Sequence, residues 1–374
     1  MKKIVVLLIS IILFSCNKED DNCKPETEAE VVYDGYAVLL TQEEVDEFSA
    51  AGYTKITGGL TIGQNSEAKS PIKDLSGLSK LNSIGGWLTI ANNPVLLNLE
   101  GLEGLKRVEG NVHIIDNNSL STMKGLDNLM MISISLKISK NSKLKNLDGL
   151  ESLIVIGQDL ELLHNYELDN VMGLSGLSSI GGKMYFSMNS SLSTLHGLNN
   201  LIHIGDKLEI LNNSDGSLTS ISGLRNLTTD LLEIEIIGTE LSDFDGLNSL
   251  TSVSSLNIQN NSKLKSFNGL NGIFQIRNNF TIHNCAIKNL HGLERLNAVH
   301  GIITIQYNSN LENIDALANF TGTFTNKVNI NNNPALNDFC GLNLLSNNFN
   351  GEFIIVDNAY NPSIADIIDG NCSQ

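Results

Sequence analysis

Three side chains at regular intervals along the chain could do chemistry on a sugar or a peptide: Glu161, Tyr185 and Glu209. A tyrosine ring offers stacking area, and glutamate oxygens accept hydrogen bonds that fix the orientation of a ligand. If the three residues lie on successive strands, the two carboxylates are about 10 Å apart, which is somewhat wide even for an inverting glycosidase pair. We also expect no Arg or Lys beside them to neutralise a uronate. Binding is therefore the predicted function, and a carbohydrate-active enzyme (polysaccharide lyase or glycosidase) is the alternative.

Apolar residues occupy the next outward position of the same strands, at Ile115, Leu163 and Leu211. A row of exposed apolar side chains is costly unless it is used. Either these residues form a binding patch together with Tyr185, or a loop or the return path of the chain covers them. The sequence leaves both alternatives open.

Composition and the absence of certain motifs argue against several classes of function. The formal net charge of −17 argues against binding to nucleic acid or docking on an anionic membrane. The seven histidines fall at different phases of the repeat described below and form no ligand set for a metal. The chain has neither a Gly-rich phosphate loop nor a G-x-S-x-G motif. We predict no catalytic residue, no metal and no cofactor, and a partner that is an unknown protein or glycan.

The elements that position these residues follow from a repeat of 23–26 residues. A Gly-Leu step, once replaced by Ala-Leu, recurs with its leucine at Leu78, Leu102, Leu126, Leu150, Leu174, Leu198, Leu224, Leu247, Leu270, Leu293, Leu317 and Leu342. Earlier in each repeat an L-x-I segment, such as Leu136-Lys137-Ile138, predicts a strand with one buried face. Twelve such copies predict a stacked architecture, because no single repeat can bury its apolar positions.

An asparagine follows the strand at the same place in most repeats. Clear examples are Asn93, Asn117, Asn141, Asn165 and Asn189. Stacking would form them into a ladder, in which each amide bonds backbone groups at an inward corner. Cys285 takes the equivalent place once, and the repeat around Gly238 lacks the asparagine. The glycine before the aligned leucine predicts a second corner, which needs positive φ or close approach between coils.

The motif IGGxLxIxxNxxLxxLxGLxxL resembles the receptor L-domain repeat, the ligand-binding module of insulin- and EGF-receptor ectodomains. It is closer still to the L-domain-like, leucine-rich-repeat-like surface lipoproteins of Bacteroidota. The resemblance covers roughly residues 40 to 350 and is specific for fold, because the shared residues are scaffold. Receptor L domains are shorter and come in pairs with Cys-rich modules, so a receptor role does not carry over. We predict an all-β solenoid, a right-handed parallel β-helix of about twelve repeats over residues 56–349, with a short N-terminal capping helix.

The start of the chain predicts export and anchoring. Residues 1–15 have two lysines before an apolar run, which is typical of a signal peptide. Cys16 follows Leu13-Phe14-Ser15, which resembles a bacterial lipobox, and lipidation of Cys16 is the prediction; plain secretion with an unpaired cysteine is the alternative. Residues 16–30 form a charged, disordered tether whose acidic run resembles the surface-export signal of Bacteroidota lipoproteins. We expect a monomer held at the bacterial outer membrane, at the cell surface, with its lipid anchor as the membrane contact.

Both ends of the solenoid should be covered, because an open coil exposes apolar side chains and unpaired strand edges. Residues 31–55 are the predicted N-terminal cap, since Thr41 and Glu44 have the spacing of a capping box that opens a helix. Residues 350–374 should close the other end. Cys340 and Cys372 could form a disulfide there, which an exported protein allows, or stay unpaired. Cys285 is expected to be buried and free.

Overall fold

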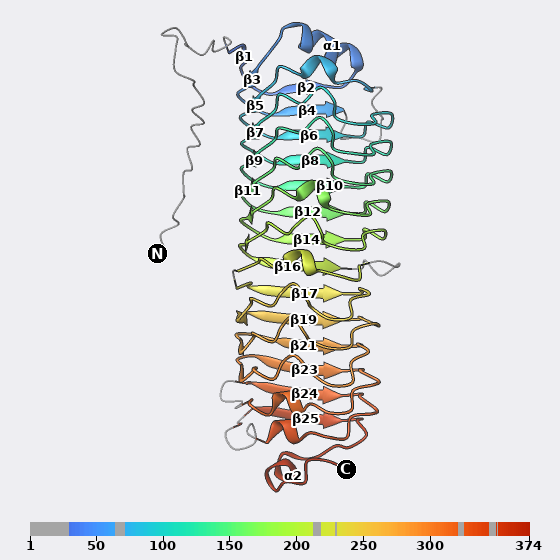
Figure 1. Ribbon diagram of the computed structural model, residues 1–374, viewed down its shortest axis with the longest axis vertical. Coiled ribbons are helices and arrows are strands. Elements are labelled where there is room, and N and C mark those ends of the chain that lie inside the picture. Colours follow the sequence, from blue (N-terminus) through green and yellow to red (C-terminus); the bar gives the residue numbers. More distant parts are fainter. Residues whose placement is uncertain are drawn as a thin grey trace, which may run out of the picture. The chain divides into compact units, whose positions relative to one another are not determined.

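The computed structural model describes residues 30–63, 72–211, 218–228, 230–320, 325–343, 349 and 351–374. Residues Val31–Gln374 form one compact unit, in which the chain winds through a stack of coils (Figure 1). The predicted signal peptide, Cys16 and the tether up to residue 29 lie outside the described residues. Within the described ranges, no helix has the length and apolar character needed to cross a membrane.

A 14-stranded parallel sheet, here called the main sheet, runs through the whole stack. Its strands in spatial order are β2 (Ala37–Leu39), β4 (Leu60–Gly63), β6 (Leu88–Ala91), β8 (Val112–Ile115), β10 (Leu136–Ser139), β12 (Leu160–Leu163), β14 (Met184–Ser187), β16 (Lys207–Leu211), β17 (Glu233–Ile237), β19 (Ser255–Gln259), β21 (Phe280–His283), β23 (Ile302–Gln306), β24 (Lys327–Asn331) and β25 (Glu352–Val356). This arrangement confirms the predicted all-β parallel solenoid of about twelve coils. The end strands β2 and β25 lie in the segments predicted as caps.

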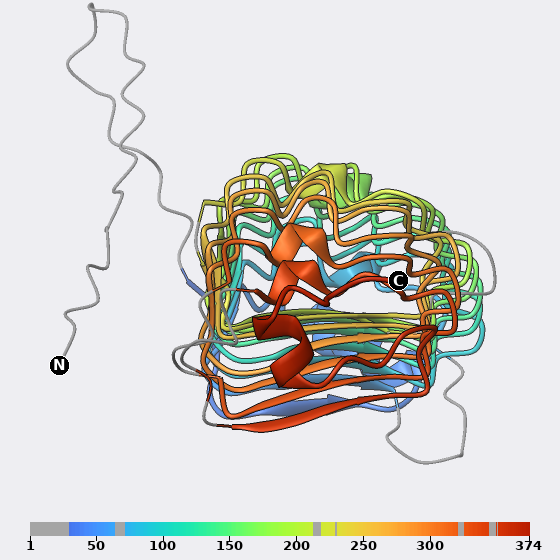
Figure 2. The same cartoon turned by 90° about the horizontal axis from the view of Figure 1, so that it is seen from below.

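Shorter strands form a second wall of the coils. An 8-stranded sheet contains β1 (Val32–Tyr33), β3 (Lys55–Ile56), β5 (Ser83–Ile84), β7 (Arg107–Val108), β9 (Met131–Ile132), β11 (Val155–Ile156), β13 (Ser179–Ile180) and β15 (His203–Ile204), and a 3-stranded sheet contains β18 (Ser252–Val253), β20 (Gln275–Ile276) and β22 (Ala298–Val299). Opposite the main sheet lie the 3-10 turns η1 (Ser76–Leu78), η2 (Met172–Leu174), η3 (Ser222–Leu224), η4 (Asp315–Leu317) and η5 (Cys340–Leu342). Figure 2 shows the main sheet and these turns as opposite sides of each coil.

A continuous column of aliphatic side chains fills the inside of the stack. In one coil, Leu136 and Ile138 point inward from β10, and Leu144, Leu147 and Leu150 point inward from the return path; all five are fully buried. Each coil alone would leave its interior open at both ends. Stacking therefore removes this apolar surface from water, which stabilises the fold by roughly 25 cal/mol per Å².

The Gly-Leu corner brings neighbouring coils into close backbone contact. At Gly125 φ is 110°, and a Cβ atom there would lie 1.8 Å from the carbonyl oxygen of Leu99 in the preceding coil. Both reasons predicted for the glycine therefore hold at this position. In other coils the same step forms a 3-10 turn instead, and η4 includes Ala316 in place of glycine.

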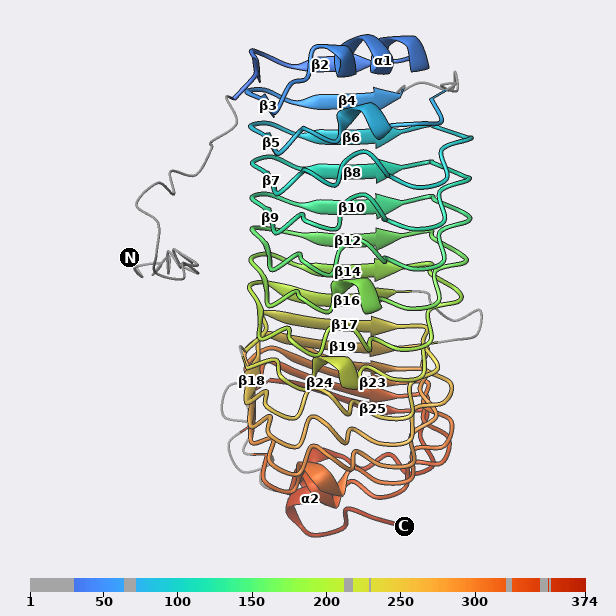
Figure 3. The ribbon, with the colours of Figure 1, turned by 45° about the horizontal axis from the view of Figure 1, so that its top comes forward.

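Short helices lie at the two ends of the stack (Figure 3). Helix α1 (Gln42–Ala50) begins with a capping box, in which the Thr41 hydroxyl accepts from the Glu44 backbone N–H at 3.2 Å and the Glu44 carboxylate accepts from the Thr41 backbone N–H. Val45 on this helix is buried. Helix α2 (Ile364–Ile368) lies at the C-terminal end and buries Ile367. Each helix thus covers part of the core at its end of the stack.

Candidate functional site

The residues singled out by their spacing share the outer face of the main sheet. Strand pairing places Tyr185 between Glu161 and Glu209 on neighbouring strands. The return path of each coil runs along the opposite side of the core, and no described element lies over the outer face (Figure 2). No described part of the chain thus separates this face from a partner, although Glu209 is only 8% exposed because its neighbours on the face cover it.

The apolar row on this face is interrupted by small residues. Ser139 pairs with both Ile115 and Leu163, and Ser187 pairs with both Leu163 and Leu211. Although the two serines point out of the sheet, Ser139 is 4% and Ser187 is 7% exposed. The flanking apolar side chains therefore cover them, and they themselves stay only partly exposed. The result is a low apolar ridge beside Tyr185.

The expectation that no Arg or Lys stands beside Glu161 and Glu209 is wrong. The Glu161 carboxylate lies 3.0 Å from the Lys137 ammonium and 2.9 Å from that of Lys183. The Lys207 ammonium lies 2.6 Å from the Glu209 carboxylate. Lys183 and Lys207 occupy a third outward row, one residue before the first inward position of their strands, and their long side chains reach along the sheet.

Burial and neighbouring charges together lower the pKa of Glu161 and raise the pKa of Glu235. Burial is the largest single effect on Glu161 and raises its pKa, but the bonds and charges of Lys183 and Lys137 together outweigh it, so the pKa lies below its ordinary value. The pKa of Glu235, which pairs with Glu209 across the strands, is raised by burial and then by the nearby charge of Glu233. The face thus carries balanced charge around Glu161 and excess negative charge around Glu235.

Tyr185 offers less free ring surface than the sequence suggests. The Lys183 ammonium lies 4.9 Å from the centroid of its ring, within the range of a cation–π contact. The tyrosine side chain is also only partly exposed. A sugar ring stacking on Tyr185 would have to share it with Lys183.

Two exposed aromatic residues at the N-terminal end of the same face, Tyr36 and Trp87, did not emerge from the sequence. Tyr36 is 67% and Trp87 is 45% exposed, and their ring centroids are 6.4 Å apart. Both belong to the third outward row, which the sequence-based alternation did not reach. Extending that alternation backwards by two residues from Thr89 would have found Trp87.

Two surface hollows lie away from these residues. One, of about 460 Å³, is lined by Met130 and Ile154 among others. The other, of about 510 Å³, is lined by Lys263, Lys265 and Lys288 among others. No residue of the predicted site lines either hollow.

Residues 53–144 match the family model of the receptor L domain. This segment contains the strands β4, β6, β8 and β10 of the parallel solenoid. The chain is a receptor L-domain-like repeat protein. No curated protein matches it. The L-domain likeness fits a binding role and leaves the partner open, and the likeness to Bacteroidota lipoproteins stays a prediction.

The asparagines of the L-domain-like repeat stack as a ladder of fully buried side chains. The Asn141 backbone N–H donates to the Asn165 side-chain oxygen at 3.1 Å, and the Asn141 side-chain amide donates to the Ile114 carbonyl at 2.9 Å. The Asn141 side-chain oxygen accepts from the Asn117 backbone N–H at 2.9 Å. The ladder continues into the C-terminal segment, where Asn358 takes the same place.

Among the described coils between Asn93 and Asn358, two replace the asparagine. Thr239 is buried, and its hydroxyl donates to the Asn261 side-chain oxygen at 2.7 Å. Cys285 donates its backbone N–H to the Asn308 side-chain oxygen at 2.9 Å. The Cys285 thiol is free and buried, and burial raises its pKa to about 11. Cys285 thus fills a structural place in the ladder.

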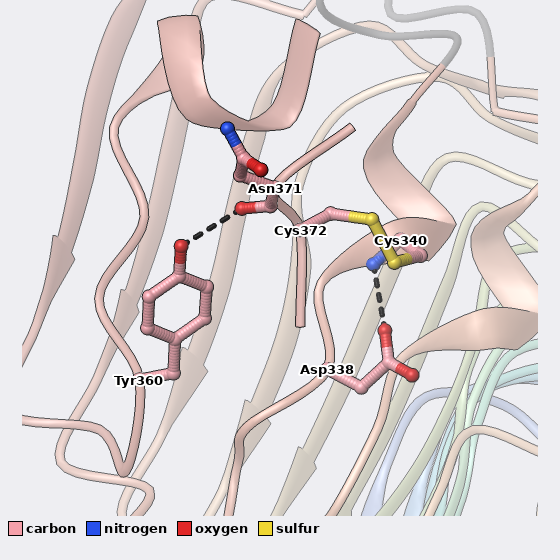
Figure 4. Close-up of a disulfide and its surroundings, with 5 residues drawn as sticks. All are labelled: Asp338, Cys340, Tyr360, Asn371 and Cys372. Atoms are coloured by element: carbon pink, nitrogen blue, oxygen red, sulfur yellow. Dashed lines mark hydrogen bonds between the residues drawn. A yellow bond between two sulfur atoms is a disulfide. The ribbon is translucent and has the colours of Figure 1, made fainter. Parts of the chain in front are cut away.

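A disulfide joins Cys340 and Cys372 at the C-terminal end, with a sulfur–sulfur distance of 1.94 Å (Figure 4). Beside it, the Asp338 carboxylate accepts from the Cys340 backbone N–H at 2.9 Å. The Tyr360 hydroxyl donates to the Asn371 carbonyl at 2.8 Å. These contacts fix the last residues of the chain against the final coils.

Proposed function

We propose that this L-domain-like protein binds an extended partner, a glycan or a protein, on the outer face of its main sheet. The observation that carries the proposal is the openness of this face across 14 strands in register, while the return path lies on the other side of the core (Figure 2). A rigid sheet presents side chains at a fixed spacing of about 4.8 Å from strand to strand. Such a surface suits a partner that also extends over several coils.

Tyr185 would lie at the centre of this site. Glu161 and Glu209 flank it, and Leu163 supplies apolar contact from the adjacent row. Glu161 supplies carboxylate oxygens as acceptors, whereas Glu209 is 8% exposed and acts by holding Lys207. The lysines that pair with these carboxylates are partly exposed and can bond an anionic or carbonyl group of the partner. The site would therefore recognise a partner with both polar and apolar groups.

Turnover of a polysaccharide is the less favoured function for the same residues. A glycosidase acid must keep its proton near neutral pH, which requires a raised pKa. The pKa of Glu161 is instead lowered by its two lysines, although burial opposes this. Glu235, with its raised pKa beside Glu209, is the carboxyl to test if degradation is ever observed.

A glycan array combined with a polysaccharide-degradation screen and a protein-partner screen would test the proposal. We expect binding without turnover. Tyr185→Ala and Leu163→Glu, made separately and checked for fold by circular dichroism, should each weaken binding at least tenfold, whereas Gln306→Ala on a distant strand of the same face should not. If both variants bind the partner as the parent does, this part of the face is not the site. Degradation that disappears in Glu235→Gln would instead support an enzyme.

We also propose that the protein is anchored in the bacterial outer membrane by lipid on Cys16, with the solenoid at the cell surface. The lipobox-like sequence before Cys16 and the charged segment after it support this. Cys16→Ser should abolish labelling with a fatty-acid probe and release the protein from the membrane fraction. Cys23→Ser, in the same segment, is the matched control and should change neither. Unchanged fractionation of Cys16→Ser would contradict the proposal, and resistance to protease added to whole cells would contradict surface exposure.

A further inference from the structure

We infer that the N-terminal end of the main-sheet face is a platform for neutral sugar rings, built by Tyr36 and Trp87. This inference rests on the proposed binding role of the face and names the class of ligand. In the order of the sheet, Tyr36 beside β2 lies six coils from Tyr185 on β14, and Trp87 beside β6 lies four coils from it. The inference can therefore fail or hold separately from the central site.

A glycine makes room for the platform. Strand pairing aligns Ala37 with Leu60 and Leu60 with Leu88, so the residues just before them, Tyr36, Gly59 and Trp87, form one row across three coils. Two coils separate the outer residues by about 10 Å along the sheet. Their ring centroids are nevertheless 6.4 Å apart, with an angle of 29° between the ring planes. The rings lean toward each other across Gly59.

Gly59 has no side chain to prevent this. A Cβ atom at Gly59 would lie 2.4 Å from the Trp87 ring. The Trp87 indole N–H donates to the Thr61 hydroxyl at 3.3 Å, which holds the ring in its place over the glycine. The platform is thus fixed before any ligand arrives, which lowers the entropy cost of binding.

The outward residues of the two strands nearest the rings are uncharged. The outward residues of β4 and β6 are Thr61, Gly63, Thr89 and Ala91, whereas charged residues crowd the middle of the face from Lys137 onward. Val38, which is 49% exposed on β2, adds apolar surface beside Tyr36. This neutrality within a chain of net charge −17 favours an uncharged ligand over an acidic or basic one.

The chemistry of exposed aromatic rings favours a sugar. Each ring face carries partial negative charge and attracts the C–H groups on the apolar face of a pyranose. The threonine hydroxyl of Thr89 can bond sugar hydroxyl groups beside the rings. A stable protein partner would need about 800 Å² of contact on each side, which two aromatic side chains do not supply. One or two sugar rings match the size of the platform.

Trp87 is the one tryptophan in the sequence, so tryptophan fluorescence, excited at a wavelength that tyrosine does not absorb, reports on this platform alone. We would titrate the full protein with neutral hexasaccharides of glucose, of mannose and of N-acetylglucosamine. At least one should cause a saturable change in tryptophan emission. Tyr36→Ala should weaken that affinity at least tenfold. Tyr307→Ala, which removes a tyrosine that is 52% exposed elsewhere, is the matched control and should leave it unchanged.

Gly59→Ala gives a second, independent variant. Gly59 does not have a left-handed φ, so the backbone accepts alanine, and the new methyl group meets the Trp87 ring. We expect Gly59→Ala to shift the emission of the free protein and to weaken saccharide binding at least tenfold, with unchanged circular dichroism. Unchanged saccharide binding in this variant would contradict the role of Gly59 in making room for the Trp87 ring.

The remaining outcomes separate this inference from the proposed function. No change in emission with any of the three saccharides, or a change that persists in Tyr36→Ala, overturns the platform. A stronger response to oligogalacturonate, or to a peptide of residues 17–30, overturns the assignment to neutral sugars. If Tyr185→Ala abolishes partner binding while no saccharide response depends on Tyr36, only the platform is wrong; if Tyr185→Ala leaves partner binding unchanged and Tyr36→Ala leaves saccharide binding unchanged, the whole face is wrong.

Discussion

The side chain of Asn141 links its own coil to the preceding one. It donates to the Ile114 carbonyl and accepts from the Asn117 backbone N–H, and it is fully buried. Asn141→Ala leaves both backbone groups without their partner in a dry environment. We expect the free energy of unfolding to fall by about 1–3 kcal/mol, measured by urea denaturation.

Asn141→Thr is the matched control for this prediction. Thr239 shows that a threonine fits the ladder and can donate to the next asparagine. This variant should therefore lose less stability than Asn141→Ala. Equal midpoints and slopes for the parent and Asn141→Ala would show that the ladder does not contribute to stability.

The ion pairs of Glu161 make the stability of the protein depend on pH. Its folded-state pKa is below the ordinary value, because two lysines outweigh the opposing effect of burial. A carboxyl of this kind contributes stability above its unfolded-state pKa and loses it as the pH falls through the folded-state pKa. Glu161→Gln should cost about 1 kcal/mol at pH 7, and the difference from the parent should shrink as the pH falls below the ordinary glutamate range.

Glu312 provides the comparison for that titration. It pairs with Lys288 at 3.7 Å, and both side chains are more than half exposed. Glu312→Gln should therefore change stability little at any pH. If the cost of Glu161→Gln stays constant from pH 7 down to acid unfolding, the ion pairs are not its cause.

At the residue scale, the sequence predicts the asparagine ladder because one residue type recurs there. The corner just before it has a left-handed residue in most of the described coils, and most of these residues are Asn, Asp or Gly: Asn92, Asp116, Gly238, Asn260, Asn284, Asn332 and Asp357. Left-handed backbone usually selects these residue types, so this corner also carries a signal, which the repeat template did not use. Lys140, His164 and Met188 have φ near 57° at the same corner, and there stacking imposes a conformation that propensity does not predict.

At the scale of the strand, the alternation of L-x-I predicts which residues point outward, and the pairing of Glu161, Tyr185 and Glu209 follows from it. The alternation was used to predict two outward positions on each strand, whereas the structure has a third. Alternation continues one step before the inward leucine, where Lys183 and Trp87 lie. Those residues have no common type, so the repeat template does not mark them. The charge balance and the aromatic pair of the face therefore emerged only from the structure.

The Gly-Leu corner sets the distance between coils, and Gly125 tests it. An alanine there would combine a φ of 110° with a methyl group 1.8 Å from the Leu99 carbonyl oxygen. The backbone of one coil must then move, and we expect a loss of about 2–4 kcal/mol in urea denaturation. Ala316→Gly, at the same step within a 3-10 turn, should cost 1 kcal/mol or less, roughly the entropy of an added glycine. Similar losses for both variants would contradict the account of close approach.

At the scale of the whole molecule, the solenoid is a chain of nearest-neighbour contacts. Each main-sheet strand pairs only with the strand before and the strand after it, from β2 to β25. In such an array the inner coils are held on both sides, whereas an end coil is held on one. Stability should therefore be lowest at the ends, where α1 and the Cys340–Cys372 disulfide lie.

Removing the disulfide should release the C-terminal end without unfolding the centre. The bond closes a chain segment with a sequence separation of 32 residues, a length for which the loss of loop-closure entropy predicts about 3–4 kcal/mol of stabilisation. Near it, the Phe339 backbone N–H donates to the Cys372 carbonyl at 2.8 Å, a contact that the bond keeps in place.

Cys372→Ser should therefore speed hydrogen exchange at the backbone amides of β24 and β25, while those of β8 to β12 exchange as in the parent, because opening at one end need not travel through the stack. The double variant with Cys340→Ser should behave the same, which separates loss of the bond from exposure of a free thiol. If exchange instead rises equally in β8 to β12, the solenoid unfolds as one cooperative unit, and a description by nearest-neighbour coils is wrong for this protein.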